Sequence, residues 1–151
     1  GFSMRFLALS PSHRRQIVED PSIIPEAVDE LLRRHGIANV ARVCRRDTVL
    51  RGVTIKAGDA MLIATALPGL DERRFERPMD VDFHRASKKS LVFGRGPHVC
   101  IGQLLARVEL KVFLQEWFAR IPDFRIPDDA IVSAAPGLAN SVLRLPLAWK
   151  S

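Results

Sequence analysis

The chain has 151 residues, 47% of them hydrophobic, which suffices for one domain with a core and excludes a disordered segment. Lysine and arginine outnumber aspartate and glutamate by 23 to 17, but the arginines are scattered and no nucleic-acid-binding motif accompanies them, so we expect no nucleic-acid partner. The two cysteines, Cys44 and Cys100, lie far apart without paired spacing, which argues against a disulfide framework and favours a reducing cytoplasm.

Three helices are expected in the first part of the chain. Apolar residues recur at helical spacing over residues 2–9, and Ser10-Pro11 separates that helix from a basic one over residues 11–20. A third helix is predicted from Pro25 to His35, because proline suits a first helical turn. The apolar start is too short to span a bilayer and resembles the end of a cut element, so we expect neither a membrane anchor nor a signal peptide.

The third helix carries a charged pair, Glu30 and Arg33, three residues apart and therefore on one side of the helix. Taken alone, this spacing is typical of a solvated surface pair that stabilises by a few tenths of a kcal/mol. A buried structural pair is the alternative.

The pattern then changes to short strands and irregular chain. Cys44 stands among alternating residues, which favours a packed, unreactive thiol. Residues 60–63 are expected to be a buried apolar run. The expected strands are 43–46, 48–50 and 53–55, and the polar stretch 68–89 is expected to contain a helical turn at 70–74 and extended chain at 78–83.

A glycine-spaced loop then delivers Cys100 to the start of a helix. The positive end of a helix dipole and unpaired backbone N–H groups both favour a thiolate, which can serve as a nucleophile, a redox thiol or a metal ligand. Gly94 and Gly96 let the backbone bend and leave room for something flat and large, against which Phe93 would pack. The alternative is a structural cysteine that merely begins a helix.

The helix that follows is expected to be the longest, from Ile101 to Arg120. Its apolar band is wide, which predicts burial on most of its circumference. Short strands around a hairpin are expected in the remainder, at 131–133 and 142–147.

The loop pattern Phe-Gly-x-Gly-x-His-x-Cys-x-Gly-x-x-Leu-Ala-Arg, residues 93–107, resembles the cysteine-ligand loop of the cytochromes P-450, the haem-thiolate monooxygenases. Glu30 and Arg33 resemble the second signature of that family, which favours the buried pair. Further segments, among them 29–34, 78–83 and 120–124, resemble the bacterial camphor monooxygenases. The resemblance implies a mainly α fold with small β-sheets (α+β), the C-terminal portion of the P-450 fold.

This resemblance implies roles for individual residues around haem b. Cys100 would be the axial metal ligand, whose electron density favours O–O cleavage, with the backbone N–H groups of residues 101–103 directed at its sulfur. His98 and Arg42 would hold haem propionates. The implied cofactor-binding residues are Arg42, Phe93, Gly94, His98, Cys100, Ile101 and Gly102; Glu30 and Arg33 are structural; Ile37, Ala38, Leu138 and Ala139 line the substrate side or, as an equal alternative, belong to the core.

Two departures from the family pattern qualify the resemblance. Many members carry arginine at the position we assign to Asp80, completing a Glu-Arg-Arg triad, so the contacts of Glu30 are expected to differ from the common ones. Family members are also more than twice as long. We therefore expect a C-terminal fragment without the distal acid and alcohol, hence with no catalytic residue of its own, organised as 1–36, 37–66, 67–92, 93–120 and 121–151.

Two functions from different classes follow. The first is the haem-binding part of a bacterial cytoplasmic monooxygenase that hydroxylates a small, camphor- or terpenoid-like substrate with electrons from a 2Fe-2S ferredoxin. This chain alone is expected to be inactive. The second is a haem-free structural fragment that self-associates through exposed apolar faces. The colour of the purified protein distinguishes the two.

Overall fold

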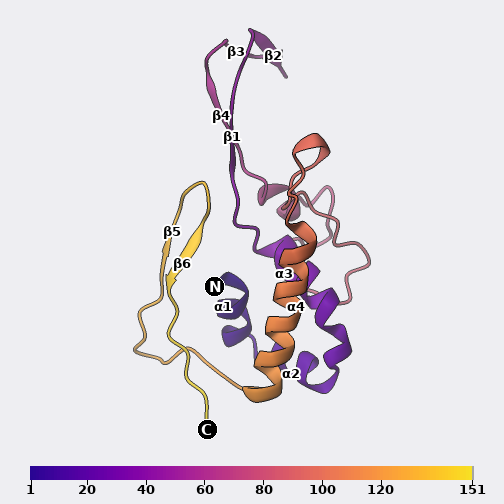
Figure 1. The fold of residues 1–151 in the computed structure, drawn as a ribbon, viewed down its shortest axis with the longest axis vertical. Coiled ribbons are helices and arrows are strands. Elements are labelled where there is room, and N and C mark those ends of the chain that lie inside the picture. The colour runs from indigo at the N-terminus through magenta and orange to yellow at the C-terminus, as the bar shows by residue number, and fades with distance from the viewer. Residues whose placement is uncertain (151) are drawn as a thin grey trace.

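The computed structural model describes residues 1–150 and is mainly helical, with three small sheets (Figure 1). The α-helices are α1 (Phe2–Leu9), α2 (Pro11–Glu19), α3 (Ile24–Arg34) and α4 (Gln103–Arg120), and the short 3₁₀ turns are η1 (Pro21–Ile23), η2 (Leu67–Leu70) and η3 (Gly96–His98). Each sheet is an antiparallel pair: β1 (Val40–Val43) with β4 (Ala60–Ile63), β2 (Thr48–Leu50) with β3 (Val53–Ile55), and β5 (Ser133–Ala135) with β6 (Ser141–Arg144). The predicted fold class is confirmed.

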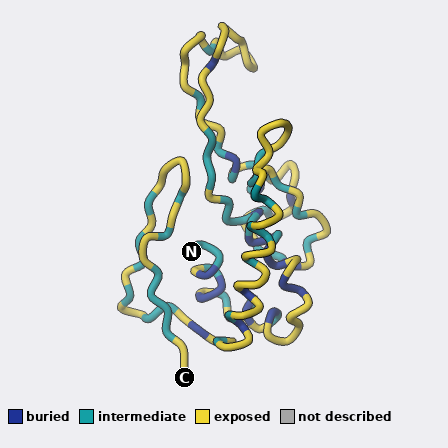
Figure 2. The backbone as a smooth tube through the Cα atoms, in the orientation of Figure 1, coloured by how far each residue is buried: buried dark blue, intermediate teal, exposed yellow. Residues whose placement is uncertain are grey.

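The core lies among the four α-helices (Figure 2). The three predicted N-terminal helices are present, and each begins or ends near the expected proline. Arg14 is buried at the junction of α1 and α2, where its Nη1 donates to the carbonyl oxygens of Leu7 at 2.7 Å and Ala8 at 3.1 Å. These bonds satisfy carbonyl groups that the end of α1 leaves without helical partners.

An arm made of β1 to β4 projects away from the helices, at the top of Figure 1. Leu62 and Ile63 are 65% and 48% exposed, so the expectation of a buried run at 60–63 is wrong. A two-stranded ribbon with no layer packed on it has no interior. The first strand also ends earlier than expected, at Val43. Cys44 is buried, as expected, with Sγ 3.0 Å from the Arg46 carbonyl oxygen.

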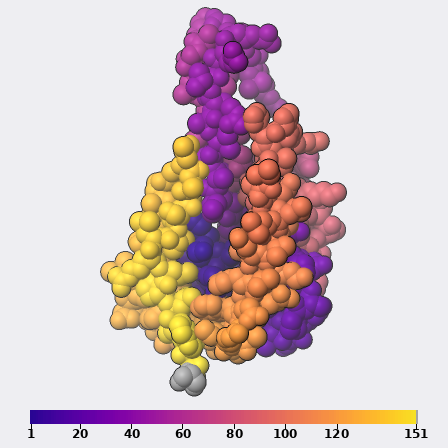
Figure 3. Space-filling view, viewed as in Figure 1, coloured from indigo at the N-terminus to yellow at the C-terminus, as the bar shows by residue number. Residues whose placement is uncertain are grey.

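The expectation that α4 is buried on most of its circumference is also wrong. Only Leu114 and Phe118 of this helix are buried, while Leu104, Leu105 and Val108 are more than half exposed. The described elements cover one side of α4, chiefly through α3, and leave the other side at the surface, as the orange helix in Figure 3 shows. No helix among residues 1–150 is both long and apolar enough to cross a membrane.

Candidate functional site

A tightly folded loop carries Cys100 to the N-terminal end of α4. Gly94 and Gly96 have φ angles of +75° and +76°, the left-handed region that side chains other than glycine's rarely adopt. The Cys100 N–H donates to the Phe93 carbonyl oxygen at 2.8 Å, which closes the loop. Cys100 is exposed and stands three residues before α4 begins. The Gln103 N–H donates to the Cys100 carbonyl oxygen at 3.3 Å.

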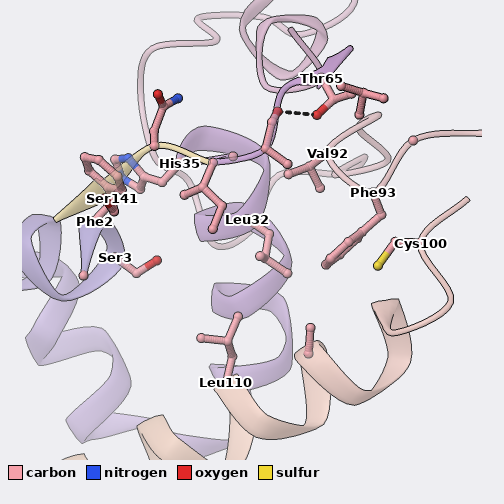
Figure 4. Close-up of a pocket in the computed structure, with 18 of the residues that line it drawn as sticks. Phe2, Ser3, Leu32, His35, Thr65, Val92, Phe93, Cys100, Leu110 and Ser141 are labelled. Carbon is pink, nitrogen blue, oxygen red and sulfur yellow. Dashed lines mark hydrogen bonds between the residues drawn. The ribbon is translucent and has the colours of Figure 1, made fainter. Parts of the chain in front are cut away.

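The Cys100 side chain lies on the wall of a cavity of about 650 Å³ (Figure 4). This volume falls within the usual range for small-molecule and cofactor sites, about 300–1,000 Å³. The first turn of α1, the end of α3, the cysteine loop, α4 and β6 supply the wall, which is predominantly apolar. In the space-filling view, α1 lies recessed between α4 and the C-terminal segment (Figure 3).

The cavity brings together six of the residues singled out from the sequence. These are Ile37, Ala38, Phe93, Gly94, His98 and Cys100. Ile37 and Ala38 follow directly on α3, whereas the other four belong to the cysteine loop, more than fifty residues later in the chain.

The other cofactor and substrate candidates lie outside the cavity wall. Arg42 is an exposed residue of β1, and its Nη1 donates to the Ala41 carbonyl oxygen at 2.8 Å. Ile101 and Gly102 lie between the thiol and α4. Leu138 and Ala139 lie beside the end of α3, where the Asn39 N–H donates to the Leu138 carbonyl oxygen and Ala38 bridges to Ala139.

Sequence reasoning missed several residues of the wall. Leu32 on α3, and Ala106 and Leu110 on α4, lie within about two helical turns of predicted site residues, and helical spacing from those residues could have identified them. Phe2, Ser3, Asn140, Ser141 and Val142 come from the two ends of the chain, and no local signal indicates them.

His35 is a titratable group in the same wall, at the C-terminal end of α3. Its Nε2 is buried without a hydrogen-bond partner, and its ring packs 5.5 Å from the Phe6 ring. Burial, followed by the positive charges of Arg34, Arg33 and Arg5, lowers the pKa of His35 to about 4. The imidazole is therefore neutral at neutral pH.

Glu30 and Arg33 form a fully buried ion pair on α3, with no exposed surface on either side chain. Arg33 Nε donates to Glu30 Oε2 and Arg33 Nη2 to Glu30 Oε1, both at 2.8 Å. The guanidinium also donates to the carbonyl oxygens of Gly69, Pro78 and Asp80. The pair therefore ties α3 to the irregular chain that leads toward the cysteine loop.

A second arginine, Arg85, completes this arrangement. Its Nε donates to Glu30 Oε1 at 3.1 Å, and the Asp82 N–H donates to the same oxygen at 3.0 Å. Burial alone would raise the pKa of Glu30, but the bonds from Arg33, Asp82 and Arg85 outweigh it and lower the pKa. Position 80 is aspartate, and the second arginine bound to Glu30 is Arg85, five residues further along the chain.

The cavity fits a haem group by the chemistry of its wall. A single thiol, Cys100, faces a roomy apolar space, which suits a metal whose other donors come from a flat organic macrocycle. Phe93 offers an aromatic face beside the sulfur (Figure 4). Gly94, whose φ of +75° other residues rarely adopt, adds no side chain to this part of the wall.

Comparisons with known proteins agree with this arrangement. The family model described as "Cytochrome P450" matches residues 18–129, more than half of the chain. Cytochrome P450 105A3 of Streptomyces carbophilus is 36% identical over 92% of this chain and 35% of its own length. The 20-oxo-5-O-mycaminosyltylactone 23-monooxygenase of Streptomyces fradiae is 37% identical over 97% of this chain and 36% of its own.

A solved structure is similar over the whole chain. The crystal structure of CYP101J2 superposes with a TM-score of 0.94 and 41% identity, covering 100% of this chain and 39% of that one. The chain thus spans somewhat over a third of the length of the relatives it matches.

Proposed function

Because the chain belongs to the cytochrome P450 family, we propose that it supplies the thiolate side of a haem-dependent monooxygenase, with Cys100 as the axial ligand. The observation that carries this proposal is the position of the Cys100 thiol on the wall of the apolar cavity, beside Phe93, Gly94 and His98. When bound, haem b supplies the iron at which oxygen is activated.

Residues of the wall, together with Arg42, Ile101 and Gly102 outside it, would then have defined tasks. The Cys100 thiolate would hold the metal, and the N–H groups of Ile101 and Gly102, which follow it in the chain, would tune its donor strength. Phe93 would pack against the cofactor, and Gly94 would leave room for it. His98 from the wall and Arg42 from β1 would bind its carboxylate groups through charge-assisted hydrogen bonds.

The substrate side is assigned to residues that follow α3 and precede β6. Ile37 and Ala38 line the cavity, and Leu138 and Ala139 lie beside them. Small apolar side chains favour a compact hydrophobic substrate, since such walls offer area for burial and few hydrogen bonds. We therefore assign a small apolar substrate, of camphor or terpenoid type, to the whole protein, with a 2Fe-2S ferredoxin as electron donor and the bacterial cytoplasm as its location.

Haem titration tests the proposal on the purified chain. We expect a coloured, stoichiometric complex for the unaltered chain and for Cys44→Ser, because Cys44 is buried in the projecting arm away from the cavity. Cys100→Ser is expected to lose the thiolate-type spectrum. Equal spectra for the two serine variants would exclude Cys100 as the ligand.

The exposed side of α4 favours a second candidate function, self-association of the haem-free chain. Leu104, Leu105 and Val108 are 72%, 61% and 56% exposed, and contiguous apolar surface of this kind favours association. Sedimentation velocity would then show a dimer that Val108→Glu dissociates and that Arg120→Gln, about three turns further along the helix, leaves intact. A haem-free monomer at all concentrations would exclude this candidate.

A further inference from the structure

A polar connection runs from α3 across α4 to the cysteine loop. Arg107 of α4 donates from Nε to Asp29 Oδ1 of α3 at 2.8 Å, and from Nη1 to the Gln103 carbonyl oxygen at 3.2 Å. The same guanidinium stands over the Phe93 ring, with its carbon 4.8 Å from the ring centroid. Arg107 therefore contacts Asp29 on α3, Gln103 on its own helix and the Phe93 ring of the cysteine loop.

Phe93 carries this connection to the thiol in two ways. Its carbonyl oxygen accepts the Cys100 N–H at 2.8 Å, and its ring lies beside the Cys100 sulfur (Figure 4). Four residues from three separate segments are thus in series: Asp29, Arg107, Phe93 and Cys100. A displacement of the Arg107 guanidinium removes the support of the ring that flanks the sulfur.

The ion pair between Asp29 and Arg107 contributes too little to stability to account for this arrangement. The Asp29 and Arg107 side chains are 44% and 37% exposed, and exposed ion pairs contribute only about 0–1 kcal/mol. A planar guanidinium can, however, stack on an aromatic face and bind a carboxylate at its edge at the same time, which fixes its orientation. The lysine ammonium is a point charge and fixes no plane.

We propose that Asp29 and Arg107 are positioning residues for the Cys100 thiol: the ion pair holds the guanidinium over Phe93, and the held ring keeps the sulfur in place on the cavity wall. This inference rests on the proposed role of Cys100 and adds to it the residues that orient the ligand. Neither Asp29 nor Arg107 lines the cavity, so neither is a catalytic residue.

Asp29 and Arg107 could instead act on Cys100 through their charges alone. Two substitutions distinguish that electrostatic role from the positioning role. Asp29→Asn leaves the arginine charge uncompensated, whereas Arg107→Gln removes that charge. Through charge alone, the two substitutions would shift the reactivity of the Cys100 thiol in opposite directions, since positive charge favours the thiolate. If the ion pair acts by holding the Phe93 ring, both substitutions release that ring, and the reactivity of the Cys100 thiol shifts in the same direction in both variants.

The test measures the rate of Cys100 alkylation by iodoacetamide across pH, in the haem-free chain with Cys44→Ser. We expect Asp29→Asn and Arg107→Gln each to raise the pH-independent rate roughly two- to fivefold, the change that loss of a weak exposed pair allows. The double variant should match either single variant, because both break one connection. Arg107→Lys, which keeps the charge, should behave like Arg107→Gln. Glu26→Gln on α3 and Arg120→Gln on α4 are the controls and should not change the rate.

A second readout uses the haem-loaded chain, in which the same variants should lower the fraction that shows the thiolate-type Soret band in the reduced CO complex. Opposite rate shifts for the two single variants, or an Arg107→Lys variant that behaves as the unaltered chain, would overturn the inference. So would unchanged rates in all variants that circular dichroism shows to be folded. If Cys100→Ser keeps the thiolate band, the proposed function fails, whereas the alkylation rates report on the positioning independently.

Discussion

Glu30 and Arg33, one helical turn apart on α3, bind each other through two hydrogen bonds of 2.8 Å with neither side chain exposed to solvent. Removing one partner of such a pair leaves an uncompensated buried charge. Arg33 in addition holds three carbonyl oxygens of the chain between residues 69 and 80. The pair therefore couples α3 to the segment that precedes the cysteine loop.

Glu30→Ala is expected to lower the free energy of unfolding by about 3–5 kcal/mol, or to prevent folding, because the Arg33 charge stays buried without its partner. Urea denaturation measures this. Glu116→Ala is the matched control, since Glu116 pairs with Arg120 on the exposed side of α4 and should change stability by about 0.5 kcal/mol or less. Similar effects for the two variants would contradict the structural role of Glu30.

Acid should destabilise the chain in two steps. His35 is neutral in the fold, with a pKa of about 4, and titrates near its ordinary value of 6.5 when unfolded. Between these values only the unfolded chain gains a proton, so stability falls as pH drops from about 6.5 to 4. The lowered pKa of Glu30 contributes stability above its ordinary value of 4.5, and that contribution is lost as pH falls through the folded pKa.

His35→Leu isolates the first of these steps. The variant should lose the slope between pH 6.5 and 4 while remaining at least as stable at pH 7, because leucine carries no unpaired buried nitrogen. Thermal unfolding at several pH values measures the slope, with His84→Leu at an exposed site as the control. A slope unchanged by His35→Leu would show that the imidazole is charged or solvated in the fold.

Gly36→Ala should destabilise the contact between α3 and the cysteine loop. A Cβ at Gly36 would lie 2.8 Å from Val92 Cγ2 and 3.1 Å from Ala66 Cα, so the segment that leads into Phe93 must move. We expect Gly36→Ala to lower the free energy of unfolding by about 1–3 kcal/mol, as for other overpacked sites. Gly137→Ala is the control, because its Cβ would meet only ordinary contacts near Ala139. Equal unfolding midpoints for the two variants would contradict the close packing at Gly36.

Sequence patterns among neighbouring residues predicted the positions of the helices well. They predicted less well which residues are buried and what those residues contact. Helical periodicity and the prolines at residues 11 and 25 depend only on neighbouring residues, so α1 to α3 follow from the sequence. The ion pair of Arg85 with Glu30 was not predicted, because the chain between Asp80 and Arg85 is irregular. Residue spacing in irregular chain does not indicate where a side chain points. The exposure of α4 depends on which elements cover it, which its own pattern cannot reveal.

The residues of the candidate site likewise fall into two groups: those that the sequence indicated and those that only the fold brings together. The pattern around Cys100 indicated the thiol, its glycines and Phe93, because all of them belong to one continuous loop. Ser3 and Ser141 reach the cavity only because the two ends of the chain meet, with Gly1 beside Val142, which is a long-range relationship. The exposed position of Arg42 on the projecting arm likewise follows from the direction of β1 and β4, which strand propensity does not fix.

The Soret band of the reduced, CO-bound complex tests the central claim most directly. The haem-loaded chain should show the strongly red-shifted band of thiolate-ligated haem if the Cys100 thiolate holds the metal. Cys44→Ser should retain this band, and Cys100→Ser should abolish it. A band at the unshifted position in the unaltered chain, or a red-shifted band that survives Cys100→Ser, would contradict the assignment of Cys100 as the axial ligand.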